Sequence, residues 1–320
     1  MKSDTPFSFE TDAADVGRRF DHVVTLRLGT QSRSRVGALI REGWIRAGGE
    51  IRKPGYRLKS GDKIEGRIPP PPPTRLTAEP IPLTILYQDR HIIVIDKPAG
   101  LVVHPAPGNL QGTLVNALLH RCPDIEGVGG EGRPGIVHRL DKQTTGVMVV
   151  AKSMAAHRFL SRQFKDRRIT KHYAALVYGE MSAAAGTIRL PIGRHPVDRK
   201  KMSTTSRRGR AAETRWTVCE RFRGATLLDL MLKTGRTHQI RVHCAAVFHP
   251  VVGDPVYGGR QKQHLSPGSV LERCVKAVDR QMLHARQLGF LHPGDETFVT
   301  FAAPLPPDMQ AVLKCLAQER

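Results

Sequence analysis

The sequence of 320 residues has few of the features that hold small secreted proteins or membrane proteins together. Its five cysteines are scattered and form no C-x-x-C pair. We therefore expect buried, reduced thiols, with neither a disulfide framework nor a cysteine zinc site. No apolar run approaches the ~20 residues of a membrane-spanning helix. The N-terminus also lacks the apolar stretch of a signal peptide, so we expect a cytoplasmic protein without membrane attachment.

The usual motifs of several enzyme classes are also missing. There is no G-x-x-x-x-G-K-[ST] phosphate loop, no G-x-G-x-x-G after a strand, no H-E-x-x-H and no G-x-S-x-G elbow. His238 and His243 are five positions apart, a spacing that does not put both on one helical face for a metal. Nucleotide hydrolysis, hydride transfer, zinc hydrolysis and serine acyl transfer therefore lack their usual parts, and we expect no metal.

Acidic residues are in short supply relative to basic ones. The chain has 50 Lys plus Arg against 29 Asp plus Glu, which gives a net charge of +21. Such a field favours a polyanionic partner, and nucleic acid comes first because neutralising its phosphates releases counterions. An acidic membrane surface is the competing partner. It would call for a basic amphipathic helix or a lipidation signal, and the sequence has neither.

A run of five prolines at residues 69–73 marks the clearest boundary in the chain. Such a run is extended and semi-rigid, because proline fixes φ and lacks an N–H donor. We expect a small N-terminal domain over residues 16–68, a proline-rich linker over 69–82 and a larger domain over 83–320.

The N-terminal domain shows two helical patterns followed by turn signals. Apolar residues at helical spacing predict one helix from Phe20 to Leu28, and Ser32 is placed to cap a second that carries Val36, Leu39 and Ile40. Gly48 and Gly49, between Ile45 and Ile51, predict a hairpin, and residues 61–62 predict a turn before a further strand. A basic helical module of this kind either binds RNA or simply carries a solvated charged face.

The larger domain alternates apolar strand-like runs with few helices. Strands are predicted at residues 92–95, 147–150, 173–178, 227–232 and near 290–301. Ser153 is expected to start one helix and Thr237 to cap another that carries Ile240 and Cys244. The helices are too few to cross over every strand pair. We therefore predict an α+β fold with a mixed, largely antiparallel sheet, flanking helices and a central cleft.

Two polar segments are the candidates for chemistry. Residues 134–146 read PGIVHRLDKQTTG and bring Asp141 into a loop that enters a buried strand, where catalytic groups concentrate. From composition alone, Asp141 could equally cap a turn or pair with Lys142. Residues 234–243 read TGRTHQIRVH, and Arg236 and Arg241 suit either a carboxylate or a phosphate.

These segments belong to a longer resemblance. PGIVHRLDKQTTGVMVVAKS resembles the signature of the RluA family of pseudouridine synthases. LYQDRHIIVIDKPAGLVVHPA, KHYAALVYG, PIGRH, TGRTHQIRVH, HPVVGDPVYGG and RQMLHARQLGFLHP fit the same family in the same order. Residues from Phe20 through SRSRVGALIREGWIRAGGEIRKPGYRLKSGDKI resemble an S4 RNA-binding domain, although Gly48 stands where that pattern more often has asparagine. Within the family, PIGRHP and GDPVYGGR are most similar to the RluD type, which modifies large-subunit ribosomal RNA.

The resemblance implies roles for particular residues. Asp141 matches the catalytic aspartate, Arg241 the arginine that pairs with it and keeps it ionised, and Tyr173 the tyrosine that stacks on the target base. Without the resemblance, a lone strand tyrosine is more often a core residue. Arg139 matches the arginine that fills the space left by a flipped nucleotide. The residues expected to contact RNA are Arg139, His138, Lys142, Arg236, His238, Arg33, Arg35, Arg199, Lys200 and Lys201.

The implied reaction isomerises uridine to pseudouridine with no net redox change, so we expect no cofactor. The expected partner is large-subunit ribosomal RNA or its precursor particle, and the expected state is a monomer. Three alternatives are a synthase for other ribosomal or transfer RNA positions, a non-catalytic ribosome-assembly factor, and a glycosidase or base-removing enzyme. A glycosidase usually needs two carboxylates, whereas the sequence near Asp141 offers cations.

Overall fold

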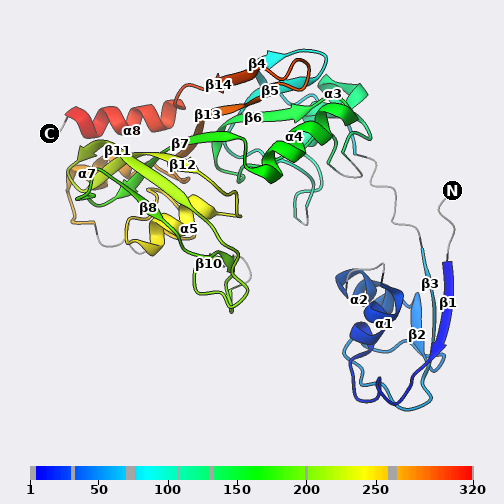
Figure 1. Cartoon of the computed structure of the whole chain (residues 1–320). Coiled ribbons are helices and arrows are strands. Elements are labelled where there is room, and N and C mark those ends of the chain that lie inside the picture. The colour runs from blue at the N-terminus through cyan, green and yellow to red at the C-terminus, as the bar shows by residue number, and fades with distance from the viewer. Residues whose placement is uncertain are drawn as a thin grey trace. The chain divides into compact units, whose positions relative to one another are not determined.

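The computed structural model divides the chain into two compact units, residues 1–75 and 76–320. It describes residues 5–29, 33–69, 76–106, 108–129, 133–198, 201–258 and 265–318. Figure 1 shows both units, and each has its own hydrophobic core. Residues 70–75, which include four of the five prolines of the run, lie outside the described residues. Among the described residues, no helix has the length and apolar character needed to cross a membrane.

The N-terminal unit packs two helices against a three-stranded sheet of order β1-β3-β2. Both predicted helices form, and Phe20, Val24, Leu39 and Ile40 are fully buried in its core. The expected cap Ser32 lies outside the described residues. The elements are β1 (Thr5–Glu10), α1 (Phe20–Leu28), α2 (Arg33–Arg41), β2 (Ile45–Ala47) and β3 (Lys63–Ile68).

The predicted hairpin at Gly48 and Gly49 is wrong in its second strand. The turn is present, with both glycines at positive φ, but only one bridge joins Ala47 to Glu50 before the chain leaves the sheet. The partner of β2 is β3 instead, and Ile51 is exposed. A further strand, β1, lies N-terminal to residue 16 and pairs with β3. These pairings join distant segments, so local turn signals did not reveal them.

The larger unit is built on one mixed sheet of order β4-β5-β6-β13-β7-β12-β11-β8, with β14 on β13 (Figure 1). All pairs described in this sheet are antiparallel except β13 with β6. The predicted α+β class is therefore confirmed. The strands are β4 (Thr84–Gln88), β5 (Ile92–Lys97), β6 (Thr145–Ala151), β7 (Thr170–Tyr178), β8 (Ala185–Ile188), β11 (Thr214–Phe222), β12 (Ala225–Leu232), β13 (Leu283–Leu291) and β14 (Phe298–Ala302); a separate ribbon pairs β9 (Gly193–Arg194) with β10 (Met202–Ser203).

Helices pack against this sheet. They are α3 (Leu114–Arg121), the short 3-10 helix η1 (Pro123–Ile125), α4 (Met154–Asp166), α5 (Gln239–Ala246), α7 (Val270–Val275) and α8 (Pro307–Gln318). Ser153 caps α4 as predicted, because its side chain accepts a hydrogen bond from the backbone of Ala156. Strand β6 is buried along its whole length.

Strand β7 shows how the sheet separates two cores. Alternate side chains of a strand point to opposite faces. Leu176 and Tyr178 share a core with α7 and α8, whereas Ala175 and Val177 share one with Ile240 of α5. Helix α5 therefore lies on the opposite face of the sheet from the C-terminal helix, and odd-numbered residues of β7 face it.

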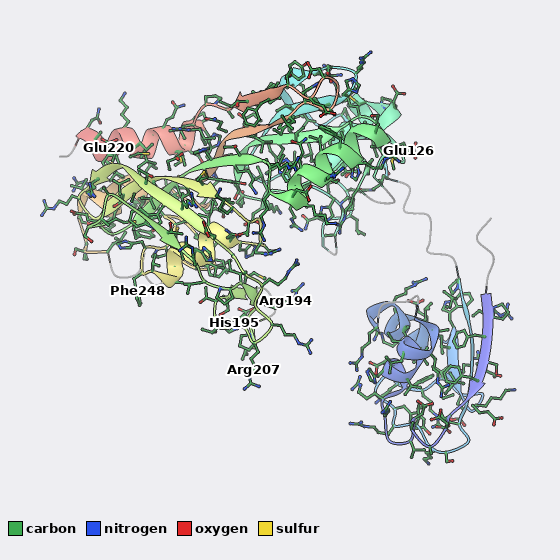
Figure 2. The ribbon with its side chains drawn as sticks, viewed as in Figure 1. Glu126, Arg194, His195, Arg207, Glu220 and Phe248 are labelled. Carbon is green, nitrogen blue, oxygen red and sulfur yellow. A yellow bond between two sulfur atoms is a disulfide. The ribbon has the colours of Figure 1, made fainter. Side chains whose placement is uncertain are left out.

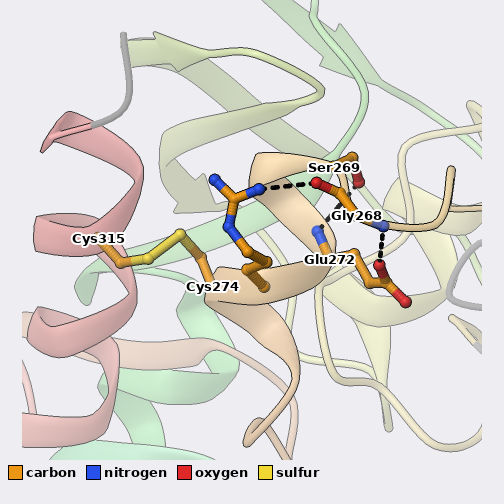
Figure 3. The surroundings of a disulfide bond; sticks show 6 residues. Gly268, Ser269, Glu272, Cys274 and Cys315 are labelled. Atoms are coloured by element: carbon orange, nitrogen blue, oxygen red, sulfur yellow. Dashed lines mark hydrogen bonds between the residues drawn. A yellow bond between two sulfur atoms is a disulfide. The ribbon is translucent and has the colours of Figure 1, made fainter.

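The expectation of reduced cysteines is wrong for two of the five. Cys274 of α7 and Cys315 of α8 form a disulfide between residues 41 apart in sequence (Figure 3). Both helices pack into the same core, which brings the two sulfur atoms together although the sequence spacing gives no sign of it. Cys122 and Cys244 are free and buried, as expected, but the free Cys219 is exposed.

Candidate active site

Asp141 lies in a tight turn that feeds directly into β6. The backbone N–H of Thr144 donates to the carbonyl of Asp141 at 3.0 Å and closes the turn. Two residues further on, Gly146 has φ of +114°, and a Cβ there would lie 2.2 Å from the carbonyl oxygen of Ala285. Only glycine suits that position. The start of β6 is thus pressed against β13, which fixes where the turn emerges.

The Asp141 carboxylate is ion-paired with Arg241 of α5. Arg241 Nη1 donates to Asp141 Oδ2 at 3.0 Å, and the arginine side chain is only 5% exposed. The other side of the guanidinium is held by Asp254, through Nε at 2.6 Å and Nη2 at 2.9 Å. Burial alone would lower the pKa of Arg241, but the two carboxylates outweigh it and raise this pKa. Arg241 therefore stays charged between two acids.

Tyr173 of β7 lines the same pocket as Asp141 and Arg241. As an odd-numbered residue of β7 it lies on the face that α5 covers, and it packs against the core that contains Ile240. Burial, and then the negative charge of Asp141, raises the pKa of the Tyr173 phenol. The ring is therefore neutral at physiological pH.

His238 lies beside Asp141 in a strained conformation. It is the N-cap of α5 with φ of +56°, so the expected cap Thr237 is wrong by one residue. Its Nε2 is 3.8 Å from Asp141 Oδ2, and its Nδ1 is 2.9 Å from the hydroxyl of Tyr257. Burial lowers the pKa of His238, against the opposing charge of Asp141. A non-glycine residue at positive φ next to a carboxylate is a common mark of a functional site.

One pocket brings together the three predicted catalytic residues and three of the predicted RNA contacts. It contains about 570 Å³ of space, part of which is open solvent. Six of the predicted site residues line it: Asp141, Arg241, Tyr173, Arg139, Arg236 and His238.

A second pocket shares Arg139, Tyr173 and Arg236 with the first and is strongly basic. We call it the basic groove; its cations are Arg139, Lys165, Arg167, Lys171, Arg210, Lys233 and Arg236. None of the described residues that line it is acidic. Burial, and then the charge of Arg167, lowers the pKa of Lys171 to about 8. Such a concentration of cations suits a polyanionic ligand.

Two other predicted contacts lie near the turn but have different surroundings. Lys142 is exposed, and its ammonium is 3.5 Å from Asn109 Oδ1. His138 lines the basic groove, where its ring stacks on Phe164. The Nε2 of His138 accepts a hydrogen bond from the backbone of Val149, and burial lowers the pKa of this histidine to about 3. We therefore expect His138 to be neutral and to support β6.

The remaining predicted RNA contacts that the structure describes, Arg33, Arg35 and Lys201, do not line the pocket of Asp141. Arg33 and Arg35 lie on α2 of the N-terminal unit, where Arg33 pairs with Asp21 at 3.1 Å. Arg199 and Lys200 fall outside the described residues. Lys201 lies 3.8 Å from Asp198, next to the β9–β10 ribbon. Figure 2 shows Arg194, His195 and Arg207 on this projecting ribbon, with Arg207 pointing outward.

The sequence reasoning missed one acidic residue, Asp254. Its side chain is fully buried, and besides Arg241 it accepts hydrogen bonds from the backbones of Val256 and Tyr257. The sequence near Asp141 offers cations, and the structure adds this acid, which binds the opposite side of Arg241. The GDPVY motif contains Asp254 directly before a proline, and this acid could have been noticed there. Its connection to Asp141 could not be predicted, because Asp141 is far away in sequence. Because Asp254 is enclosed by donors, it does not supply the second free carboxylate of a glycosidase.

Comparison with known proteins decides the family. Residues 91–246 match the model of the RNA pseudouridylate synthases, and residues 18–64 match the S4 domain. A protein of Xanthomonas campestris named ribosomal large subunit pseudouridine synthase D is 44% identical over 303 residues, 95% of this chain and 90% of that protein. The chain belongs to the RNA pseudouridylate synthase family. The resemblance inferred from the motifs is thereby confirmed.

Other relatives agree. A protein of Pseudomonas aeruginosa with the same name is 43% identical over 95% of this chain and 93% of its own length. The solved structure of human RNA pseudouridylate synthase domain containing 1 superposes with a TM-score of 0.55 at 31% identity, over 72% of this chain and 87% of that one. The protein is thus an RNA pseudouridine synthase with an S4 domain, and the alternative of a non-catalytic assembly factor falls away.

Proposed function

We propose that this enzyme isomerises uridines to pseudouridine in large-subunit ribosomal RNA, with Asp141 as its catalytic carboxylate. The observation that carries the proposal is the placement of Asp141 in a pocket between the buried Arg241 and the ring of Tyr173. The choice of substrate is supported by the name of the relatives in Xanthomonas campestris and Pseudomonas aeruginosa.

The reaction exchanges one glycosidic bond for another. The N1–C1′ bond breaks, the uracil turns, and a C5–C1′ bond forms; C5 then loses its proton while N1 takes one up. Positive charge develops at the sugar during cleavage, as in glycoside hydrolysis. Asp141 stabilises this charge, either by attacking C1′ or by removing a sugar proton. Because electrons are neither gained nor lost overall, the proposed reaction needs no redox cofactor.

The neighbours of Asp141 have separate tasks in this proposal. Arg241 keeps the carboxylate ionised and oriented. Tyr173 stacks on the uracil while it turns, and Arg139 occupies the space that the flipped nucleotide leaves. The flanking phosphates are expected in the basic groove, whose cations would neutralise them. One protein molecule contains all these groups, so the proposed active form is a monomer.

The test is pseudouridine formation in large-subunit RNA transcribed without pseudouridine, mapped by carbodiimide treatment and primer extension. Wild-type protein should create specific stops, and Asp141→Asn should abolish them, a loss of at least ~10³-fold, as is usual when the catalytic carboxylate is removed. Asp124→Asn, which changes an exposed carboxylate on η1, serves as the matched control and should keep full activity. Transfer RNA in a parallel reaction tests the alternative substrate. Stops that persist with Asp141→Asn would refute the assignment.

A further inference from the structure

Two buried basic side chains, Lys97 and Arg280, hold the turn that contains Asp141. Lys97 Nζ donates to the carbonyl of Lys142 at 3.1 Å, and Arg280 Nη1 donates to the carbonyl of Gln143 at 3.2 Å. Lys142 and Gln143 are the two central residues of the turn. Peptide carbonyls shielded from water require donors, and each of these two part-buried carbonyls receives one from a buried basic side chain. The plane of the turn, and with it the direction of the Asp141 side chain, is therefore set by these two contacts.

Arg280 is itself held almost without freedom. It is 3% exposed, and its Nε and Nη2 donate to the two oxygens of Asp308 at 2.6 and 2.7 Å. Its Nη1 donates to the carbonyl of Gln281 at 3.0 Å as well as to Gln143. A planar guanidinium engaged on both sides has one orientation. Asp308 lies in the first turn of α8, so the C-terminal helix determines where Arg280 points.

The segment around Arg280 also supports the partner of Asp141. A Cβ at Gly253 would lie 2.1 Å from the carbonyl oxygen of Arg280, so the two backbones touch. The backbone of Met282 donates to the carbonyl of Val252 at 2.8 Å. Asp254, which orients Arg241, follows directly. Residues 280–282 are thus the common support of the turn that carries Asp141 and of the loop that holds Arg241.

We propose that Arg280, oriented by Asp308 of the C-terminal helix, is a positioning residue that sets Asp141 in register with Arg241. This inference rests on the proposed catalytic role of Asp141. Arg280 is not among the described residues that line the substrate pocket, so it acts through the Gln143 carbonyl and makes no contact of its own with the RNA. Its loss should therefore affect the chemical step and leave RNA binding in place.

The first test separates kcat from KM in single-turnover and steady-state assays on large-subunit RNA. Arg280→Lys keeps the charge but cannot bind both Asp308 oxygens and the Gln143 carbonyl. It should lower kcat by about 10- to 100-fold, the usual cost of a catalytic group displaced by about 1 Å, with KM changed less than about twofold. Asp308→Asn should lower kcat less, and Asp308→Glu should restore most of it. Arg286→Met, a half-exposed arginine of β13 that pairs with Asp229, is the control and should keep both constants.

The second test needs no activity. Hydrogen exchange followed by mass spectrometry should show faster exchange of the turn amides, including that of Thr144, in Arg280→Lys and Asp308→Asn. Peptides from α4 should exchange as in wild type. If wild-type protein forms no pseudouridine, the proposed function fails, and unchanged exchange at the turn would then separately overturn the positioning role. If wild-type protein is active, two results for the variants would also overturn the positioning role of Arg280. One is a raised KM at unchanged kcat, and the other is a loss of kcat accompanied by faster hydrogen exchange throughout the chain.

Discussion

The two units of this protein use their cations in opposite ways. In the N-terminal unit two carboxylates, Asp15 and Asp21, are buried, and the arginines that bind them are about half-exposed. Asp21 is 6% exposed and binds Arg19 and Arg33, whose side chains are 44% and 50% exposed. Burial would raise the pKa of Asp21, but the hydrogen bonds from both arginines outweigh it and lower this pKa. The larger unit also contains three basic residues that are themselves buried: Lys97, Arg241 and Arg280 are each at most 5% exposed.

The difference separates cations that are available to a partner from cations that fix geometry. A half-exposed arginine loses little when it exchanges a carboxylate for a phosphate, because water already screens both contacts. A buried cation has lost its hydration and depends on each protein oxygen that replaces water. The half-exposed arginines of the N-terminal unit are therefore suited to binding RNA. The buried basic residues of the larger unit instead hold Asp141 and its turn in place.

The largest expected effect is that of removing the carboxylate opposite a buried cation. Asp254→Asn leaves the Arg241 guanidinium buried with Asp141 as its remaining anionic partner. We expect the free energy of unfolding to fall by about 3–5 kcal/mol and kcat to fall with it. Urea unfolding and the pseudouridine assay measure the two effects.

The control for this change is an exposed ion pair of the same unit. Asp166 lies 3.6 Å from Arg162 on α4, with side chains 37% and 83% exposed. Asp166→Asn should lower the free energy of unfolding by less than about 0.5 kcal/mol. Equal losses in the two variants would show that burial does not distinguish the two kinds of cation.

The buried Lys97 is expected to have a smaller effect on the free energy of unfolding, and this effect should depend on pH. Burial lowers its pKa from the ordinary 10.5 to about 7, against the attraction of Asp141. Between these two values the unfolded chain binds a proton that the folded chain has released. Folding is therefore favoured as pH rises. The contribution of Lys97 to stability should increase by at most about 1.4 kcal/mol per pH unit in this window.

The measurement compares urea unfolding of wild type and Lys97→Met at several values between pH 7 and 10. The stability difference should shift toward wild type as pH increases, because methionine binds no proton in either state. Lys314→Met, at an exposed position of α8, should show no such trend. A difference that stays constant with pH would mean that Lys97 remains charged in the folded protein, held by its three carbonyl acceptors.

Much of the fold could be predicted because its signals are local. The strands around Ile92–Ile95 and Val147–Val150 are continuous apolar runs, and α1 and α4 have regular apolar spacing. The pairing of strands was not predictable in this way, since β1 with β3 and β6 with β13 join distant segments. The disulfide of Cys274 and Cys315 was missed for the same reason.

The candidate site could also be predicted only where its signals are local. Asp141, Arg241 and Tyr173 were found because each lies in a motif that resembles a known family, and the structure places them around one pocket. Arg280 and Lys97 also lie in motifs of that family, but their task is visible only in contacts to the turn, across 137 and 45 residues of sequence. A side chain that acts through a backbone carbonyl leaves no residue pattern at its target.

The smallest effect on the free energy of unfolding is expected from a change at Arg33 in the N-terminal unit. The same change is expected to affect RNA binding. Arg33→Gln removes one of two half-exposed partners of Asp21, and Arg19 remains. The free energy of unfolding should change by less than about 1 kcal/mol. If Arg33 contacts a phosphate, the slope of log K against log salt for RNA should become shallower by about 0.7–0.9. Arg162→Gln, which breaks an exposed ion pair on α4, should leave that slope unchanged. An unchanged slope in Arg33→Gln would show that this arginine does not contact RNA. It would also count against the distinction between surface cations that bind RNA and buried cations that fix geometry.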